Sequence, residues 1–315
     1  MNTPLNRIAA GLGWLALGVA SGVVPVSSAR AEMAEMTASA EVKGGGCAVA
    51  VKMLTEIVVR QRAALAETAA KKSADEAEDV RPKLQRVADD YEVLVAAHPG
   101  FAAAWAAYGL FLCEPVVEQR RTALALLFKA NGLDGELPLV KNQIGVLLAE
   151  EGRMIEALNY FLAASDLAPK EALYHFQIGL VLDEARESFL KTQAWTTATI
   201  EKTVLEAFRR AVELAPERTD YAYRAAEAYY GLAEPRWEEA YKTWSALEQR
   251  LSGDIEKQAV RLHMARVQWK IGHAAVAREL AGSVDVAELK GQRAKLFAEF
   301  DAEDAAEAAA KKAGR

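Results

Sequence analysis

The sequence predicts an all-α chain, built as a solenoid of about five to six helical hairpins with a closing helix near its C-terminus. The stretch from Gly145 to Pro169 has the residue spacing of two short helices packed against each other. This spacing recurs along the chain with a period of roughly 34 residues, which is typical of helical repeat proteins. In addition, little of the sequence alternates with the period of two that half-buried strands require.

The stretch from Gly145 to Pro169 shows how one hairpin would form. Gly145 and Ala157 are small residues at which the two helix backbones can approach closely. Phe161 lies one turn after Ala157 on the same helix face and would fill the space that the small residues leave. Gly152 is placed to end the first helix, and Pro169 cannot continue the second.

The same offsets return both upstream and downstream of this hairpin. Copies of the second helix begin at Val87, Ala123, Val204 and Ala240, and a weaker copy contains Ala265, Gly272, Ala277 and Ala281. Most neighbouring copies are spaced by the period or by two residues more, but the copies that end at Pro169 and Pro216 are 47 residues apart. The thirteen extra residues lie between Gly179 and Val204, and the atypical terminal copies are expected of capping units.

The first helices carry a second recurring signature, an aromatic or apolar residue followed by glycine. It reads Trp105, Tyr108, Gly109 in the first clear hairpin, Ile144, Gly145 in the next, and Tyr174, Ile178, Gly179 in the third. The fourth has Ala226 in place of the glycine. This pattern resembles the tetratricopeptide repeat (TPR) family from residue 47 to residue 300. The resemblance implies a right-handed superhelix whose stacked first helices line a concave groove.

Counting each repeat from its glycine, the resemblance places a set of side chains in this groove that would bind a partner. These candidates are Asn142, Phe176, Asp183, Tyr223, Glu227, Tyr230, Arg266 and Trp269. Tyrosine, tryptophan and arginine commonly anchor binding sites, because they bring a large contact area. The alternative is that Tyr230 and Trp269 simply bury between repeats. The groove lacks the paired lysine and asparagine with which chaperone-binding members hold a C-terminal carboxylate.

The thirteen-residue insertion carries apolar residues at its centre. It falls within residues 184–203, with Phe189, Leu190 and Trp195 at its apex. If both helices of this hairpin simply extend, we expect an exposed apolar tip, which usually marks a contact. The partner of the tip would be either the long first helix of the same chain or a foreign protein.

The N-terminal 31 residues are predicted to be a secretory signal peptide. Arg7 precedes an apolar run from Ile8 to Val26, and Ala29-Arg30-Ala31 forms a small-x-small cleavage site. The alternative is an uncleaved membrane anchor, since the run is close to the length of a spanning helix. We therefore expect an exported, periplasmic protein, with an inner-membrane anchor or secretion as alternatives. Residues 32–46, which end in three glycines, are predicted to be a flexible linker.

The remaining elements follow from local signals. A long helix is expected from Ala48 to Lys72, a solvated elbow at Asp75 to Asp79, and a new helix with Pro82 in its first turn. A closing helix is expected from Val286 to Phe300, with Leu289, Arg293 and Leu296 on one side. Residues 301–315 form a low-complexity tail of Ala, Glu, Lys and Asp, which we expect to fray.

No catalytic or metal-binding motif accompanies this scaffold. The four histidines, His98, His175, His263 and His273, have no partners at zinc-site spacing, and the carboxylate pairs lie at expected helix ends. Cys47 and Cys113 are expected to lie too far apart for a disulfide. Removing residues 1–31 would change the net charge from −6 to about −8, which argues against nucleic acid and anionic membranes as partners.

These observations predict an exported scaffold or adaptor that binds a protein or peptide in its concave groove, without a cofactor, a metal or enzymatic activity of its own. A membrane would be a partner only if the signal segment stays uncleaved. Clustered groove aromatics also suit a small-molecule or glycan-binding module. A structural subunit of a homo-oligomer is the third alternative.

Overall fold

A computed structural model describes residues 48–70 and 80–313 of the chain. It divides into two compact units, an N-terminal unit that ends at Val181 and a C-terminal unit that begins at Leu182. Within these ranges every regular element is a helix, as the sequence predicts. The predicted signal peptide (1–31), the linker (32–46), Cys47 and the elbow at 75–79 lie outside the described residues.

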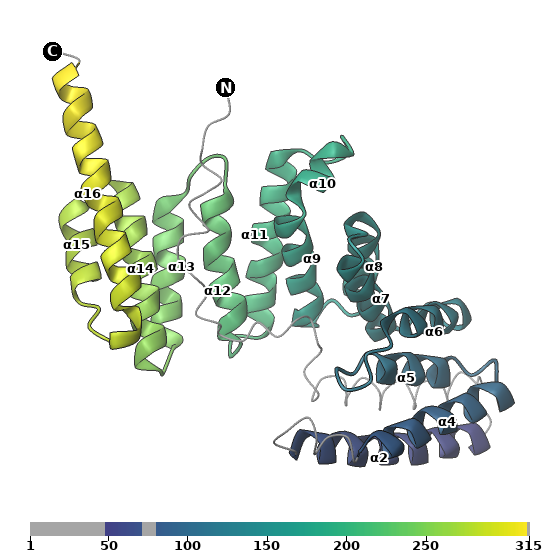
Figure 1. The fold of residues 1–315 in the computed structure, drawn as a ribbon. Coiled ribbons are helices and arrows are strands. Elements are labelled where there is room, and N and C mark those ends of the chain that lie inside the picture. Colours follow the sequence, from purple (N-terminus) through teal and green to yellow (C-terminus); the bar gives the residue numbers. More distant parts are fainter. Residues whose placement is uncertain (1–47, 71–79, 314–315) are drawn as a thin grey trace. The chain divides into compact units, whose positions relative to one another are not determined.

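The N-terminal unit consists of helices that pack as consecutive antiparallel pairs (Figure 1). The pairs are α2 with α4, α5 with α6 and α7 with α8, so the hairpins predicted here are confirmed. Their bounds are α2 (Ala48–Ala70), α4 (Arg81–Ala97), α5 (Ala102–Leu112), α6 (Arg120–Leu133), α7 (Pro138–Glu150) and α8 (Met154–Leu167), followed by most of α9 (Ala172–Glu184).

The C-terminal unit continues in the same manner after the last residues of α9. Its elements are α10 (Arg186–Lys191), α11 (Thr197–Leu214), α12 (Thr219–Glu227), the 3₁₀ helix η2 (Ala228–Gly231), α13 (Trp237–Arg250), α14 (Asp254–Ile271), α15 (Ala274–Gly282), the 3₁₀ helix η3 (Ala287–Leu289) and α16 (Lys290–Ala313). Helix α12 pairs with α13 and α14 pairs with α15, while α16 packs against both α14 and α15 (Figure 1).

The α7–α8 hairpin shows why the recurring residues are needed. A methyl group added at Gly145 would lie only 2.6 Å from Cε1 of Phe161, so the glycine is required for the close approach of the two helices. Gly152 follows α7 with a φ of +79°, the left-handed conformation that glycine adopts without strain. The Arg153 amide then donates to the Leu148 carbonyl at 2.9 Å, a bond that closes the helix end. The predicted roles of both glycines are confirmed.

The C-terminal tail differs from its expected behaviour. The closing helix does not stop at Phe300 but continues as α16 to Ala313, and the expectation that the segment from Asp301 frays is wrong. Alanine, glutamate and lysine have high helix propensity, so the composition favours continuation of an existing helix. In addition, Asp301 and Asp304 both form ion pairs with Arg278 of α15, at 2.7 and 2.9 Å.

Candidate functional site

The predicted groove residues fall on the first helices of hairpins, except Tyr230, which lies on the 3₁₀ helix η2. Two of them, Asn142 on α7 and Phe176 on α9, belong to the N-terminal unit. The other six belong to the C-terminal unit and are here called the candidate face: Asp183, Tyr223, Glu227, Tyr230, Arg266 and Trp269.

Asn142 and Phe176 do not line an open surface. Asn142 is fully buried and Phe176 is 6% exposed. Every residue of α7 from Asn142 to Leu148 is buried, because this helix is apolar on nearly all sides and is covered by its neighbours. The amide nitrogen and oxygen of Asn142 have no hydrogen-bond partner. The expectation that these two side chains face a groove is therefore wrong.

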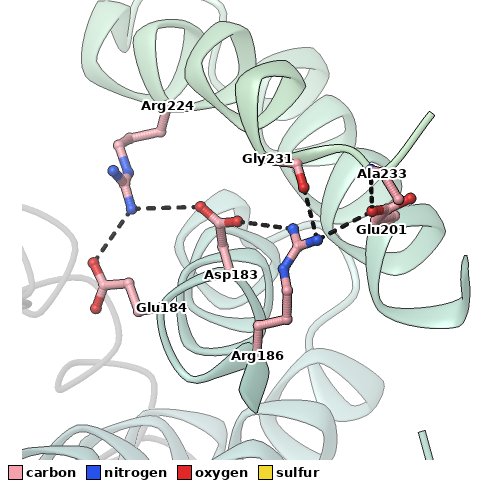
Figure 2. Close-up of polar contacts among 7 residues, drawn as sticks. All are labelled: Asp183, Glu184, Arg186, Glu201, Arg224, Gly231 and Ala233. Atoms are coloured by element: carbon pink, nitrogen blue, oxygen red, sulfur yellow. Dashed lines mark hydrogen bonds and ion pairs between the residues drawn. The ribbon is translucent and has the colours of Figure 1, made fainter. Parts of the chain in front are cut away.

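In the C-terminal unit, a polar network begins at Arg186, which lies on α10 (Figure 2). Its guanidinium donates to the Gly231 carbonyl at 2.8 Å, to Glu201 at 3.1 Å and to Asp183 at 3.4 Å. Glu201 of α11 also accepts the backbone amide of Ala233 at 2.7 Å. Arg186 therefore ties α10 and α11 to the end of η2.

Arg224 on α12 extends this network along the candidate face. It donates to Glu184 and to Glu227, both at 3.2 Å, and lies 4.0 Å from Asp183 (Figure 2 shows the Asp183 and Glu184 contacts). Its Nε is buried and has no partner. The network thus contains four carboxylates, Asp183, Glu184, Glu201 and Glu227, against two guanidinium groups.

Two carboxyl groups of this network bind a proton more readily than usual, chiefly because they are partly buried. Burial raises the pKa of Glu184 and of Glu227 above the usual range of a glutamate, although the nearby Arg224 acts in the opposite direction. A positive group placed beside this network would be favoured by the excess of acidic over basic side chains in it.

The tyrosines of the candidate face meet at His263 of α14. The Tyr223 hydroxyl lies 2.9 Å from Nε2 of His263, and the Tyr230 hydroxyl lies 3.2 Å from Nδ1. Trp244 of α13 stacks on the imidazole with ring centroids 4.2 Å apart. Burial, together with the positive charge of Arg266, lowers the pKa of His263 from 6.5 to about 3. A neutral imidazole has one donor and one acceptor, so one tyrosine accepts a hydrogen bond and the other donates one.

The remaining two residues of the candidate face are in contact with α16. Arg266 donates to Glu299 at 2.8 Å, and the indole N–H of Trp269 donates to Glu303 at 2.8 Å. Trp269 also stacks on Phe300, with ring centroids 4.2 Å apart. The closing helix of the chain itself therefore contacts Arg266 and Trp269.

Two truncations test how much of α16 contributes to the fold. A chain that ends at Phe300 is expected to lose about 1–2 kcal/mol of unfolding free energy, because Trp269 loses its acceptor and Arg278 loses both carboxylates. A chain that ends at Asp304 is expected to stay within about 0.5 kcal/mol of the full-length protein. Urea denaturation measures both values, and equal losses would contradict these roles of Asp301, Glu303 and Asp304.

The insertion does not form the expected exposed tip. Helix α11 does extend early, starting at Thr197, but α9 stops at Glu184 and the short α10 follows. Phe189 is fully buried and meets the edge of Trp195 at 5.8 Å between ring centroids, while Leu190 and Trp195 are half-buried. The turn holds this shape because the Thr192 hydroxyl donates to the Phe189 carbonyl at 2.7 Å. The expectation that these three residues form an exposed apolar end is therefore wrong.

Sequence reasoning missed Arg186, Glu201, Arg224 and His263. Arg224 and His263 stand two residues before the small residues Ala226 and Ala265, so they share one position in the repeat. A comparison of the repeats at that position could have found them. Arg186 lies in the insertion, which no repeat register covers.

Metal ligands, thiols and membrane-spanning helices were also considered within the described ranges. They contain no group of three or more His, Cys, Asp or Glu side chains placed to hold a metal ion. Cys113 is a free thiol whose pKa is raised by burial to about 12. No helix of these ranges is long and apolar enough to cross a membrane.

The fold defines the class of protein. The chain has the fold of the TPR solenoids, as comparison with solved structures shows. YrrB, described as a TPR protein with an unusual peptide-binding site, is 16% identical, with 68% of this chain and 99% of YrrB covered and a TM-score of 0.54. PilW, a type IV pilus biogenesis factor, is 11% identical, with coverage of 80% and 99% and a TM-score of 0.51.

PilF of Pseudomonas aeruginosa is 19% identical, with coverage of 80% and 99% and a TM-score of 0.50. At these identities the similarity establishes the fold alone. No protein-family model and no curated protein matches the sequence.

Proposed function

We propose that the protein is a scaffold or adaptor that binds a protein or peptide through the candidate face, and that it carries out no chemistry of its own. Two features support this. The TPR fold presents successive first helices side by side, and YrrB, which shares this fold, has a peptide-binding site. Asp183 and Glu227 of the candidate face also belong to a connected polar network in the C-terminal unit.

The proposal rests on one observation: in this network the carboxylates that bind Arg224 are more exposed to solvent than Arg224 itself. The side chain of Arg224 is 13% exposed, whereas those of Glu184 and Glu227 are 57% and 34% exposed. The guanidinium group is thus inside and the carboxylates are outside. A partner would meet hydrogen-bond acceptors in negative excess, which favours segments that carry lysine or arginine.

The aromatic residues favour a protein partner over a sugar. A glycan-binding site needs exposed aromatic faces, but Trp269 stacks on Phe300 and both tyrosine hydroxyls contact His263. These rings therefore already have partners within the chain. For this reason we favour a protein or peptide partner over a glycan or another small molecule.

The test compares three short peptides of one length that carry lysine, serine or glutamate at the same positions. The lysine peptide is expected to bind, and the Glu184→Gln, Glu227→Gln double variant to bind it at least about tenfold more weakly, or about 1.4 kcal/mol. Binding should also weaken with added salt, because exposed charges are screened. Isothermal titration calorimetry measures each affinity.

A matched control changes the net charge by the same amount elsewhere. Glu238 and Glu239 are exposed in the first turn of α13, and their replacement by glutamine should leave the affinity unchanged. The proposal fails if the control weakens binding as much as the test variant, or if the glutamate peptide binds as well as the lysine peptide.

We further propose that the protein is exported to the periplasm. The support is the arrangement of Arg7, the apolar run and the Ala29-Arg30-Ala31 site in the sequence. Mass spectrometry of the chain recovered from cells should give a mature N-terminus at Glu32. A chain that keeps Met1 in a membrane fraction would support the uncleaved anchor instead.

A further inference from the structure

His263 lies at a junction between two hairpins of the C-terminal unit. Its two ring nitrogens reach hydroxyls on two different elements, Tyr223 of α12 and Tyr230 of η2. Its flat face is covered by Trp244 of α13. One imidazole of α14 therefore joins the first helix of the α14–α15 hairpin to all three elements of the α12–α13 hairpin.

The surroundings of this imidazole disfavour its protonated form, because it is buried and Arg266 already places a positive charge nearby. Arg266, one turn along α14, is 7% exposed, and its Nε is buried without a partner. The carboxylate bound to Arg266, Glu299 of α16, has a side chain that is 42% exposed. From α12, Glu227 raises and Arg224 lowers the pKa of Tyr223, and Trp244 of α13 is uncharged. No described carboxylate forms a hydrogen bond or ion pair with His263.

The segment that holds Tyr230 is itself suited to local opening. Helix α12 ends after nine residues and continues as the 3₁₀ helix η2, whose hydrogen-bond geometry is poorer than that of an α-helix. The Gly231 carbonyl at its end is held from the other side by Arg186. The Tyr230 ring packs against Trp237 and Trp244, and its hydroxyl is held by His263, so Tyr230 connects this short 3₁₀ helix to α13 and α14.

We propose that His263 is a proton-sensitive joint: while neutral it holds α12 and η2 against α14, and on binding a proton it lets this contact open. The inference does not depend on partner binding at the candidate face.

The direction of the effect follows from linkage. An imidazole released to solvent takes up a proton below pH 6.5, whereas the packed imidazole does not, so the open state gains protons as the pH falls. Each pH unit below 6.5 then multiplies the open population by up to about ten, and between pH 7.5 and pH 5.0 the expected increase is about 30-fold.

Hydrogen exchange of the full chain, corrected for the pH dependence of the chemical rate, tests this proposal. Amides of η2 and of the middle of α14 should lose protection about 30-fold between pH 7.5 and pH 5.0, while those of α7 and α8 should not. In His263→Gln, which keeps one donor and one acceptor, this difference should vanish. A uniform loss along the chain, or an unchanged response in the variant, would overturn the proposal.

A measurement on the unmodified protein keeps the test valid if the variant does not fold. The imidazole signal of His263 can be followed by carbon NMR and assigned through its contact with the Trp244 ring. We expect it to remain that of a neutral imidazole at pH 6.5 and to titrate only at a lower pH, where the protonated, open state becomes the major one. Titration near pH 6.5 with η2 still protected would show that protonation does not open the joint.

Discussion

Replacing Gly145 by alanine is expected to lower the unfolding free energy by about 1–3 kcal/mol, because the added methyl group would meet the ring of Phe161 at 2.6 Å. Phe161 is 1% exposed and cannot move aside without disturbing the α7–α8 hairpin. Its own replacement by alanine should cost about 3–5 kcal/mol.

The two substitutions should not add. Once the Phe161 ring is absent, the three atoms nearest to the methyl group at position 145 are gone, so the double variant should be more stable than the sum of the single losses predicts by about 0.5–3 kcal/mol. Gly132→Ala on α6 is the control, since nothing lies within 4 Å of the added methyl group. It should be neutral or stabilise by up to about 1 kcal/mol. Additive losses in denaturant titrations would show that the two residues do not share this space.

Replacing Arg186 by methionine is expected to lower the unfolding free energy by about 2–3 kcal/mol, between the values for exposed and for fully buried ion pairs. The change leaves the Gly231 carbonyl and the carboxylates of Asp183 and Glu201 without this donor. The Arg186 and Glu201 side chains are only 20% and 13% exposed, so water replaces the lost bonds poorly.

Arg209→Met provides the matched comparison. Arg209 pairs with Glu213 four residues along α11, but its side chain is 61% exposed, so the loss should not exceed about 0.5 kcal/mol. Chemical denaturation of both variants gives the two values. An equal cost for the two arginines would indicate that the Arg186 network adds no stability beyond a surface ion pair.

The candidate face was predictable in part. Asp183, Tyr223, Glu227, Arg266 and Trp269 lie on first helices, as the repeat register predicts, because the register follows from the spacing of small and large residues. Tyr230 lies just beyond, on the 3₁₀ helix η2. The register did not predict their partners. His263 contacts tyrosines 33 and 40 residues away, and Arg186 reaches a carbonyl 45 residues away, so no local pattern reports these contacts.

The repeat register also did not predict which side chains are exposed, because exposure depends on the surrounding residues. Asn142 occupies a groove position in the repeat, yet it is buried, because α7 is apolar around nearly its whole circumference. Phe189 was expected at an exposed tip, but α9 ends at Glu184 and the turn after α10 directs the ring against Trp195.

The sequence by itself determined the hairpins, their period and the positions of the residues that let helices approach or end. These features depend on side-chain size and backbone freedom at single positions. Both are properties of the residue type, and they do not depend on the rest of the fold. Only the tertiary structure decided which polar groups meet, that α16 continues to Ala313 and contacts Arg266 and Trp269, and that His263 joins two hairpins. Such contacts depend on distances of a few ångströms between residues far apart in the chain, and these are set by packing.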